Sequence, residues 1–349
     1  MKAVVYPGYR VLPSVTEVPA PDCPAGGVVL DVGATGVCRS DWHAWQGHDP
    51  VPLPHIPGHE MAGTVAAAGS EVTRWRPGDR VTVPFVCGCG TCEFCRAGQA
   101  QVCPSQTQPG FTGPGSFAEQ VAIPAADVNL VALPGAVSFV TAACLGCRFA
   151  TAFRAVTAHG RLRAGQWLAV HGCGGAGLSA VLIGAALGAR VIAVDVAPVA
   201  LARARELGAA EAVLAGPDQV AGPAAAIQDL TGGGAHVSLD TFGSPGTAAA
   251  SVRSLRRRGR HVQVGLLLGP DAAAPLPMDQ VIARELEIYG SHGMAAADYP
   301  AMLALISGQT LRLDRLLGQV IGLAGAPAAL AALGQPPAAA GMTVIDLTR

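Results

Sequence analysis

Four cysteines within one short stretch have the spacing of a metal-binding loop. Cys89, Cys92, Cys95 and Cys103 are separated by two, two and seven residues. Such intervals let four thiolates converge on one tetrahedral zinc ion, and a site closed by four cysteines leaves no position for a substrate. We therefore expect a structural zinc here. Cys87 is a fifth thiol in the same stretch and leaves the identity of the first ligand open.

Cys38 and His59 form a second candidate metal site. Sulfur and imidazole nitrogen are both zinc ligands, and a carboxylate, from Glu60 or from Asp41, would orient the ring of His59. Taken singly, an ordinary core cysteine and an incidental histidine would account for these residues. Together they indicate a site for chemistry.

The third group is the glycine-rich segment Gly172-Cys-Gly174-Gly175-Ala-Gly177, which follows an apolar run ending at His171. Glycines permit close approach of the backbone to a pyrophosphate, and a helix that begins there favours the negative charge. Asp195 stands 18 residues beyond Gly177, where a carboxylate can hold the ribose hydroxyls of the adenosine half of a dinucleotide. Cys173 inside the motif has no evident role.

Two kinds of structure must position these side chains. The first part of the chain, to about residue 145, is broken by Pro and Gly and predicts an irregular, mostly β domain. Its expected strands are Val28–Val32, Gly63–Ala67, Arg80–Val83 and Glu119–Ile123.

From about residue 150, apolar runs alternate with Ala- and Leu-rich stretches, which predicts a parallel sheet with crossover helices. The expected strands are Gln166–His171, Arg190–Asp195, His236–Asp240 and His261–Gly265, and the helices are Gly177–Leu187 and Pro198–Leu207. The arginine-rich run Arg253–Arg260 is interpreted as a solvated helix end. A helix over Tyr299–Ser307 and a strand over Met342–Leu347 close the chain.

Composition narrows the function classes. A chain of 349 residues, half of them hydrophobic, predicts two globular domains. The formal charge is −1, so the chain has no net positive charge to attract nucleic acid or an anionic membrane, and neither is expected as a partner. The apolar stretch Gly174–Ala189 is too short to span a bilayer, and Pro7 and Pro13 interrupt any signal peptide, so we expect a cytoplasmic protein. Ten cysteines in such a chain indicate metal binding rather than disulfides.

The run Gly58-His59-Glu60-x2-Gly63-x5-Gly69-x2-Val72, with the four-cysteine loop and the glycine-rich motif, resembles the zinc-dependent medium-chain alcohol dehydrogenases. The resemblance covers nearly the whole chain. It implies an α/β protein with a GroES-like, mostly β catalytic domain (1–147), a Rossmann doubly wound coenzyme domain (148–289) and a C-terminal segment (290–349) that returns to the first domain.

In that family the catalytic zinc takes one histidine and two cysteines. The resemblance assigns these to Cys38, His59 and Cys147. Cys147 is preferred to Cys144 because it directly follows a glycine and stands four residues before Thr151, which would pack on the nicotinamide.

The resemblance also assigns a proton relay and several contacts. Ser40 would accept the alcohol proton and pass it through the nicotinamide ribose to His43, which releases it to solvent. Arg39 would pair with the coenzyme pyrophosphate. Glu60 would sit behind the zinc and transiently replace its fourth ligand. Phe85 would line the substrate pocket.

Two features stay open at this level. Met342 stands where many relatives have an arginine, which puts one coenzyme contact in doubt, and Trp42 and Trp45 belong either to the cleft or to the core.

The implied activity is reversible hydride transfer between an alcohol and NAD, giving an aldehyde or ketone, with two zinc ions per chain. Asp195 favours NAD over NADP, whose extra phosphate it would repel. Family analogy implies a homodimer or homotetramer. The alternatives are a polyol or formaldehyde-type dehydrogenase of the same superfamily, and a non-catalytic, zinc-stabilised dinucleotide-binding protein.

Overall fold

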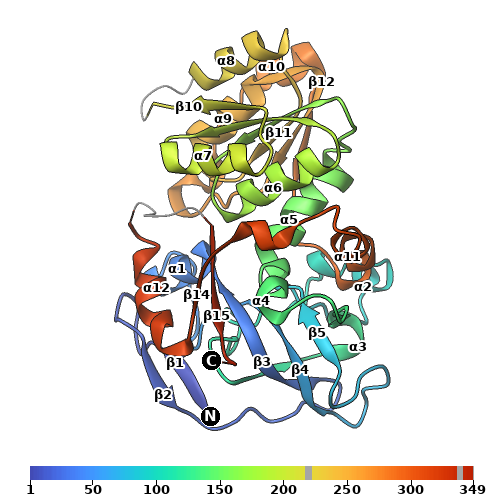
Figure 1. Cartoon of the computed structure of the whole chain (residues 1–349), viewed down its shortest axis with the longest axis vertical. Coiled ribbons are helices and arrows are strands. Elements are labelled where there is room, and N and C mark those ends of the chain that lie inside the picture. The colour runs from blue at the N-terminus through green and yellow to red at the C-terminus, as the bar shows by residue number, and fades with distance from the viewer. Residues whose placement is uncertain (217–221, 336–340, 349) are drawn as a thin grey trace.

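The chain forms two lobes, each built around one large sheet (Figure 1). The computed structural model describes residues 1–216, 222–335 and 341–348. The first lobe contains strands β1 to β7 together with the last two strands, β14 and β15, and the second lobe contains β8 to β13. Both chain ends therefore lie in the first lobe, and the second lobe is inserted between them.

The sheet of the first lobe has the order β14-β15-β3-β4-β5-β7, with β6 paired to β3, and β1 and β2 form a separate hairpin. Its strands are β1 (Lys2–Val5), β2 (Ser14–Glu17), β3 (Val28–Val37), β4 (Glu60–Ala68), β5 (Arg80–Val83), β6 (Gln120–Ile123), β7 (Val131–Ala132), β14 (Leu317–Ile321) and β15 (Met342–Asp346). Its helices are α1 (Arg39–Gln46), α2 (Glu93–Arg96), α3 (Ala126–Asn129), α4 (Phe139–Ala142), α11 (Tyr299–Ser307) and α12 (Ala326–Ala332).

Strands β3 and β4 position the residues of interest. They are antiparallel, and Gly36 near the end of β3 lies opposite Glu60 at the start of β4. The residue that follows β3, Cys38, and the residue that precedes β4, His59, are therefore brought to the same end of the sheet.

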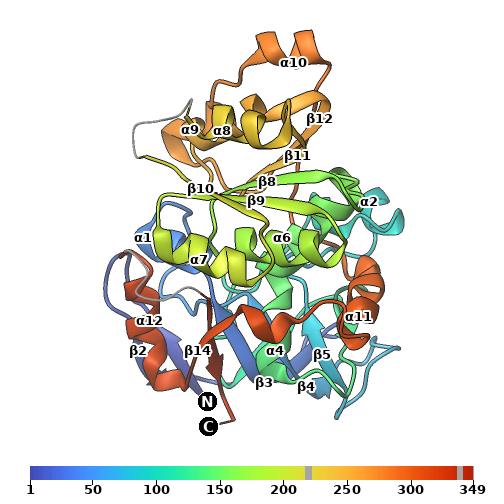
Figure 2. The same cartoon turned by 45° about the horizontal axis from the view of Figure 1, so that its top comes forward.

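The second lobe contains a six-stranded sheet of order β10-β9-β8-β11-β12-β13, in which every pair is parallel. Figure 2 shows α6 and α7 on one face of this sheet and α8 and α9 on the other. The elements are β8 (Trp167–His171), α6 (Gly175–Ala186), β9 (Arg190–Asp195), α7 (Pro198–Glu206), β10 (Glu211–Leu214), α8 (Gly222–Thr231), β11 (Ala235–Asp240), α9 (Pro245–Arg253), β12 (Leu255–Gln263), α10 (Met278–Arg284) and β13 (Glu287–Gly290).

The strand order reverses between β8 and β11, which are neighbours in the sheet although α6, β9, α7, β10 and α8 separate them along the chain. In a parallel doubly wound sheet such a reversal leaves a crevice at the carboxyl ends of the strands. Gly172 follows β8 and Thr241 follows β11, and the hydroxyl of Thr241 donates a hydrogen bond of 2.6 Å to the carbonyl oxygen of Gly172. The predicted coenzyme motif thus lies at the point where this fold binds ligands.

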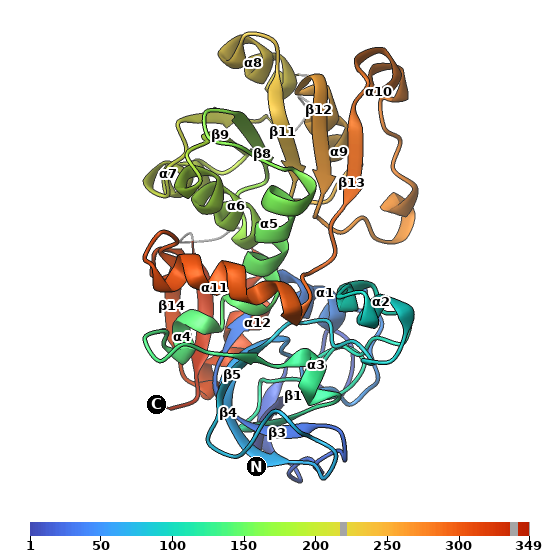
Figure 3. The same ribbon diagram turned by 90° about the vertical axis from the view of Figure 1, so that its right-hand side faces the viewer.

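A short helix with a π-helical segment at each end leads from the first lobe into the second. The π-helical segments Leu145–Phe149 and Ala155–His159 flank α5 (Ala150–Arg154), and α5 packs against α6. Figure 3 shows α5 rising from the first lobe into the second. Within the described residues, no helix has the length and apolar character needed to cross a bilayer.

The parallel sheet and most predicted elements are confirmed. Strand β5 and helix α11 have the predicted limits, and β9 matches in full. Among the described residues, six strands were not expected: β1, β2, β7, β10, β13 and β14.

The interpretation of Arg253–Arg260 as a helix end was largely wrong. Helix α9 does end at Arg253, and the arginines that follow at 256–258 are exposed. Their backbone nevertheless lies within β12, which pairs with β11 at Leu255 and again from Arg260, with an irregular register between these two positions.

Candidate active site

Cys38, His59 and Cys147 meet at the end of the first-lobe sheet. Their two sulfur atoms and one imidazole nitrogen lie within 4.8 Å of one another. Cys38 caps helix α1, His59 stands before β4, and Cys147 lies in the π-helical segment Leu145–Phe149. Such segments widen a helix locally and are frequent at functional sites, and here the widening places the cysteine beside the sheet.

Asp41 orients His59. The Asp41 carboxylate lies 2.8 Å from Nδ1 of His59, and it also accepts hydrogen bonds from the backbone N–H groups of Cys38 and Gly58. The other ring nitrogen, Nε2, is buried and has no hydrogen-bond partner in the described part of the chain. An unpartnered buried nitrogen beside two thiols is what a metal ligand looks like without its metal. Of the two carboxylates that the sequence offered, Asp41 contacts the histidine.

Cys144 lies outside this group. It is fully buried in the apolar cluster that also contains Leu145 and Phe149, and burial raises the pKa of its thiol to about 12. A thiol in such surroundings is a packing residue rather than a thiolate ligand.

Glu60 is held by Arg148. The Arg148 backbone N–H and Nε donate hydrogen bonds of 2.9 and 3.1 Å to Oε1 of Glu60, and Nη2 donates to Oε2. Both carboxylate oxygens are therefore occupied, so Glu60 could approach a metal only if this ion pair opened.

Helix α1 carries the residues of the predicted proton relay. The hydroxyl of Ser40 lies 3.8 Å from the sulfur of Cys38. His43, one turn further along, is half-buried, and its Nδ1 lies 3.1 Å from Nδ1 of the exposed His48. Burial, with Arg39 and His48 nearby, lowers the pKa of His43 to about 4. His43 is therefore neutral near pH 7.

Aromatic rings surround the open side of the group. The ring of His59 lies 5.0 Å from that of Phe111 and 6.1 Å from that of Phe85, which in turn lies 5.2 Å from the ring of His292. His292 also lines a cavity of about 470 Å³ between the lobes, together with Gln101 and Val102 of the first lobe and Gln263 and Val264 of the second. The cavity is linked to the ligand group through the contact of His292 with Phe85, and the three ligands themselves do not line it.

Of the two tryptophans, Trp45 is a core residue, packed with Tyr6, Val51 and Leu330. Trp42 is only partly buried, and its ring contacts those of His43 and His48 at the surface of α1.

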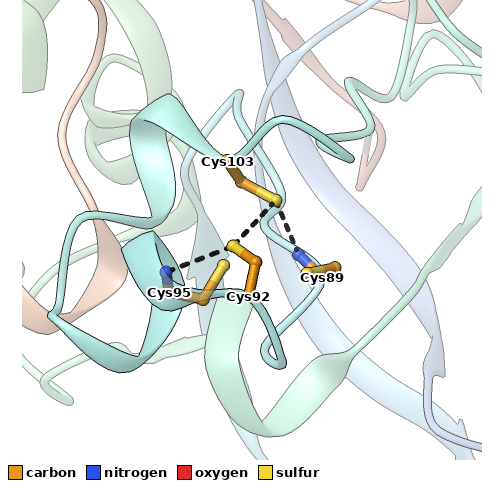
Figure 4. A group of neighbouring side chains, drawn as sticks. All are labelled: Cys89, Cys92, Cys95 and Cys103. Carbon is orange, nitrogen blue, oxygen red and sulfur yellow. Dashed lines mark hydrogen bonds between the residues drawn. The ribbon is translucent and has the colours of Figure 1, made fainter.

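The four remaining predicted ligands form a separate group (Figure 4). The sulfur atoms of Cys89, Cys92, Cys95 and Cys103 lie within 4.8 Å of one another, and backbone N–H groups of Cys89 and Cys95 donate to sulfur atoms within the group. Cys87 is not a member, because its side chain is buried in the apolar core of the first lobe.

The glycine-rich segment forms the turn between β8 and α6. Gly172 has a φ of +92°, and a Cβ at Gly177 would lie 1.8 Å from the carbonyl oxygen of Gly172, so the turn requires glycine at both positions. Gly174 has open space around it, and Gly175 faces Arg148. Cys173 contributes its backbone N–H, while its thiol is buried.

Three further predicted contacts surround this turn. Asp195, at the end of β9, accepts hydrogen bonds of 2.6 and 2.8 Å from the backbone N–H groups of Cys173 and Ala197. The hydroxyl of Thr151 is buried and has no partner in the described ranges. Arg39 is exposed, where it packs over Trp42 and donates to the carbonyl oxygen of Leu333.

Comparison with known proteins identifies the family. A family model described as "Alcohol dehydrogenase GroES-like domain" matches residues 24–135, and one described as "Zinc-binding dehydrogenase" matches residues 175–308. An alcohol dehydrogenase of Geobacillus stearothermophilus is 35% identical over 83% of this chain and 84% of its own length, and one of Rhizobium meliloti is 38% identical over 79% of each. The chain belongs to the medium-chain dehydrogenase/reductase family.

The solved structure of the family's alcohol dehydrogenase TADH from Thermus sp. ATN1 superposes with a TM-score of 0.90, at 29% identity and 99% coverage of both chains. The first lobe is thus GroES-like and the second is of the Rossmann type, as expected. As a member of the alcohol dehydrogenases of the medium-chain family, the chain is an oxidoreductase.

Sequence reasoning missed three residues of this medium-chain dehydrogenase site. These are Arg148, Phe111 and His292, and the last two lie far from the motifs in sequence and reach the site only through the fold. Arg148 is the exception to this distance, because it directly follows the predicted ligand Cys147. It also carried a signal: a charged residue in an otherwise apolar stretch requires a partner.

Proposed function

We propose that this chain is a zinc-dependent alcohol dehydrogenase that uses NAD to interconvert an alcohol and its aldehyde or ketone. The observation that carries the proposal is the convergence of Cys38, Cys147 and the unpartnered Nε2 of His59 at the end of the first-lobe sheet. Two thiols and one imidazole form the three-ligand set of a catalytic zinc with one open position.

We further propose two zinc ions per chain. The donor atoms of Cys38, His59 and Cys147 fit the catalytic ion, and the four-cysteine group fits a structural ion with all positions filled. Zinc at the first site would supply a Lewis acid toward the oxygen of the substrate, and NAD would supply the hydride acceptor.

The chain's own residues would then orient the ligands and move a proton. Asp41 holds the ring of His59 so that Nε2 faces the two sulfur atoms. Ser40, beside Cys38, would accept the proton of the substrate hydroxyl, and His43 would pass it to solvent at the surface where His48 lies. Phe85 and Phe111 would exclude water from the reacting atoms.

The preference for NAD rests on Asp195. Its carboxylate lies against the coenzyme turn through Cys173, in the position where it would accept hydrogen bonds from ribose hydroxyls. NADP would bring a phosphate against the same charge. If about 2 kcal/mol of this repulsion survives screening, NAD is favoured roughly 30-fold.

The domain limits 1–147, 148–289 and 290–349 are part of this proposal, supported by the pairing of β15 with β3. The homodimer or homotetramer and the cytoplasmic location stay predictions from the sequence.

The test combines metal analysis with kinetics. We expect two zinc ions per chain and dehydrogenase turnover. The value of kcat/KM is measured for primary, secondary, aromatic and polyol alcohols and for formaldehyde. A best substrate among the polyols, or formaldehyde, would select that alternative within the superfamily. One tightly held zinc without turnover would select the non-catalytic protein.

The coenzyme is tested with NAD and NADP at fixed ionic strength. Asp195→Gly should lose most of the preference for NAD, whereas Asp271→Gly, an exposed acidic residue of the same lobe, should keep it. Equal use of both coenzymes by the unaltered protein would show that Asp195 does not set the choice.

A further inference from the structure

The Glu60–Arg148 ion pair links two of the three chain segments that carry the candidate ligands of the catalytic metal. Glu60 directly follows His59, and Arg148 directly follows Cys147. The Glu60 side chain is fully buried and that of Arg148 is 11% exposed. A buried pair of this kind fixes the two segments relative to one another, because separating it would leave an uncompensated charge in the interior.

Arg148 also touches the coenzyme turn. A Cβ built at Gly175, the first residue of α6, would lie 2.4 Å from Cδ of Arg148 and 3.3 Å from its Nη1. A Cβ at Gly36, on the other side, would lie 2.9 Å from Nη2. The side chain therefore crosses from the ligand-bearing segment to the start of α6, in a space that glycines keep open at both ends.

The guanidinium divides its donors between these neighbours. Nε and Nη2 donate to Glu60, and Nη1 and Nε lie 3.3 and 3.4 Å from the position of a Cβ built at Gly175. A guanidinium has five N–H donors in a rigid plane, so binding Glu60 along one edge leaves Nη1 able to bind an anion along another. The start of α6 is where a pyrophosphate is favoured by the helix N-terminus.

We infer that Arg148 binds the coenzyme pyrophosphate while it holds Glu60, and so positions the coenzyme relative to the metal ligands. The inference rests on the proposed function, because it requires a dinucleotide at the turn Gly172–Gly177. Met342, where the sequence resemblance expects an arginine, is buried and apolar, so it supplies no charge there. Arg148 supplies one from a different segment.

The experiment measures binding rather than turnover. Calorimetry on the zinc-loaded protein gives dissociation constants for ADP-ribose, which contains the pyrophosphate, and for adenosine, which lacks it. Arg148→Gln should weaken ADP-ribose binding by about 10- to 100-fold, the range for loss of a charge-assisted contact, and change adenosine binding by less than about 2-fold. Arg148→Lys should bind ADP-ribose with an affinity between those of Arg148→Gln and the unaltered protein, because the ammonium group is a point charge and cannot bind Glu60 and the pyrophosphate at once.

Two further variants separate coenzyme binding from a merely structural role. In Glu60→Gln/Arg148→Gln no buried charge is left unpaired, so this double variant should fold even if Arg148→Gln does not. It should still bind ADP-ribose about 10- to 100-fold more weakly than the unaltered protein. Arg163→Gln, at an exposed position before β8, is the control for loss of one positive charge and should bind both probes normally.

The outcomes distinguish the inference from the function on which it rests. Restored ADP-ribose binding in the double variant, or equal losses for ADP-ribose and adenosine, would show that Arg148 only neutralises Glu60 or supports the turn. Turnover of alcohol with normal ADP-ribose binding by Arg148→Gln would overturn the inference and leave the function intact. Tight, Arg148-dependent ADP-ribose binding without turnover would support the inference and overturn the proposed function.

Discussion

Nδ1 of His59 and the carboxylate of Asp41 lie 2.8 Å apart, and neither side chain reaches the surface. Asp41 comes from the first turn of α1 and His59 from the residue before β4, so the contact joins the helix to the sheet. It also determines which ring nitrogen is free. A histidine whose Nδ1–H is held by a carboxylate presents Nε2 to a metal.

Asp41→Asn should weaken zinc binding at the catalytic site by about 10- to 100-fold, because a neutral amide holds the ring less firmly and lowers its basicity. In competition with a chromogenic chelator, the zinc of the catalytic site should be released at a lower chelator concentration than in the unaltered protein. Release of the zinc of the four-cysteine group should be unchanged. Asp31→Asn, on the exposed side of β3, is the control. Equal zinc affinity in Asp41→Asn and the unaltered protein would contradict the role assigned to Asp41.

Cys147→Ser should remove one of the two zinc ions and nearly all turnover while the chain stays folded, because the four-cysteine group is separate. Cys144→Ser should keep both ions, since its sulfur lies in the apolar cluster. Zinc content by elemental analysis, with circular dichroism for the fold, decides between them. Loss of zinc from Cys144→Ser but not from Cys147→Ser would reverse the assignment.

Cys92→Ser should lower the free energy of unfolding by more than about 2 kcal/mol, because metal binding at the four-cysteine group contributes to folding of its loop. Thermal unfolding and aggregation measure the effect. The exposed Cys23 supplies the control, Cys23→Ser, which should unfold as the unaltered protein does. A Cys92→Ser variant of undiminished stability would count against a structural zinc.

Ser40→Ala should lower kcat/KM for alcohol oxidation by at least about 100-fold, and His43→Gln by less than about 10-fold. Water can replace the outer group, which lies near the surface, more easily than the hydroxyl beside Cys38. Profiles across pH, taken with one alcohol, give both values. Equal losses, or a larger loss in His43→Gln, would show that the relay does not run in this order.

Acid should destabilise the second lobe through two buried histidines. Burial lowers the pKa of His171 to about 3 and that of His261 to about 4, against about 6.5 in the unfolded chain. The unfolded chain therefore binds more protons below pH 6.5, and stability that is fully present above this pH is lost as the pH falls toward 4. Each histidine should lower the free energy of unfolding by about 2 kcal/mol when the pH falls from 7.5 to 5.

Urea unfolding at the two pH values checks this expectation. His261→Gln should reduce the loss between them by about 2 kcal/mol, whereas His48→Gln, at an exposed position, should leave it unchanged. An identical loss in all three proteins would place the acid sensitivity elsewhere.

The sequence predicted the parts of the site that depend on local spacing. The four cysteines and the glycine-rich turn each lie in one short segment, so their geometry follows from local chain conformation. Strands β8, β9 and β11 were predictable because a strand buried on both faces forms a continuous apolar run.

Relationships across the sheet were not predictable in this way. Asp41 and Glu60 were equal candidates for orienting His59, and only the register of β3 against β4 places Asp41 on the ring and turns Glu60 toward Arg148. The start of β12 was hidden because its exposed arginines interrupt the apolar pattern, and because the register of β12 against β11 is irregular between Leu255 and Arg260.

The pairing of β15 with β3 has a consequence for synthesis on the ribosome. Residues 343–346 pair with residues 34–37, the part of β3 that leads directly to Cys38. That edge of β3 stays without this partner until residues 343–346 have been synthesised, whereas the parallel sheet of the second lobe is complete by Gly290. A nascent chain can therefore form its coenzyme-type lobe first, and the ligand set that includes Cys38 gains its full support only after residues 343–346 have emerged from the exit tunnel.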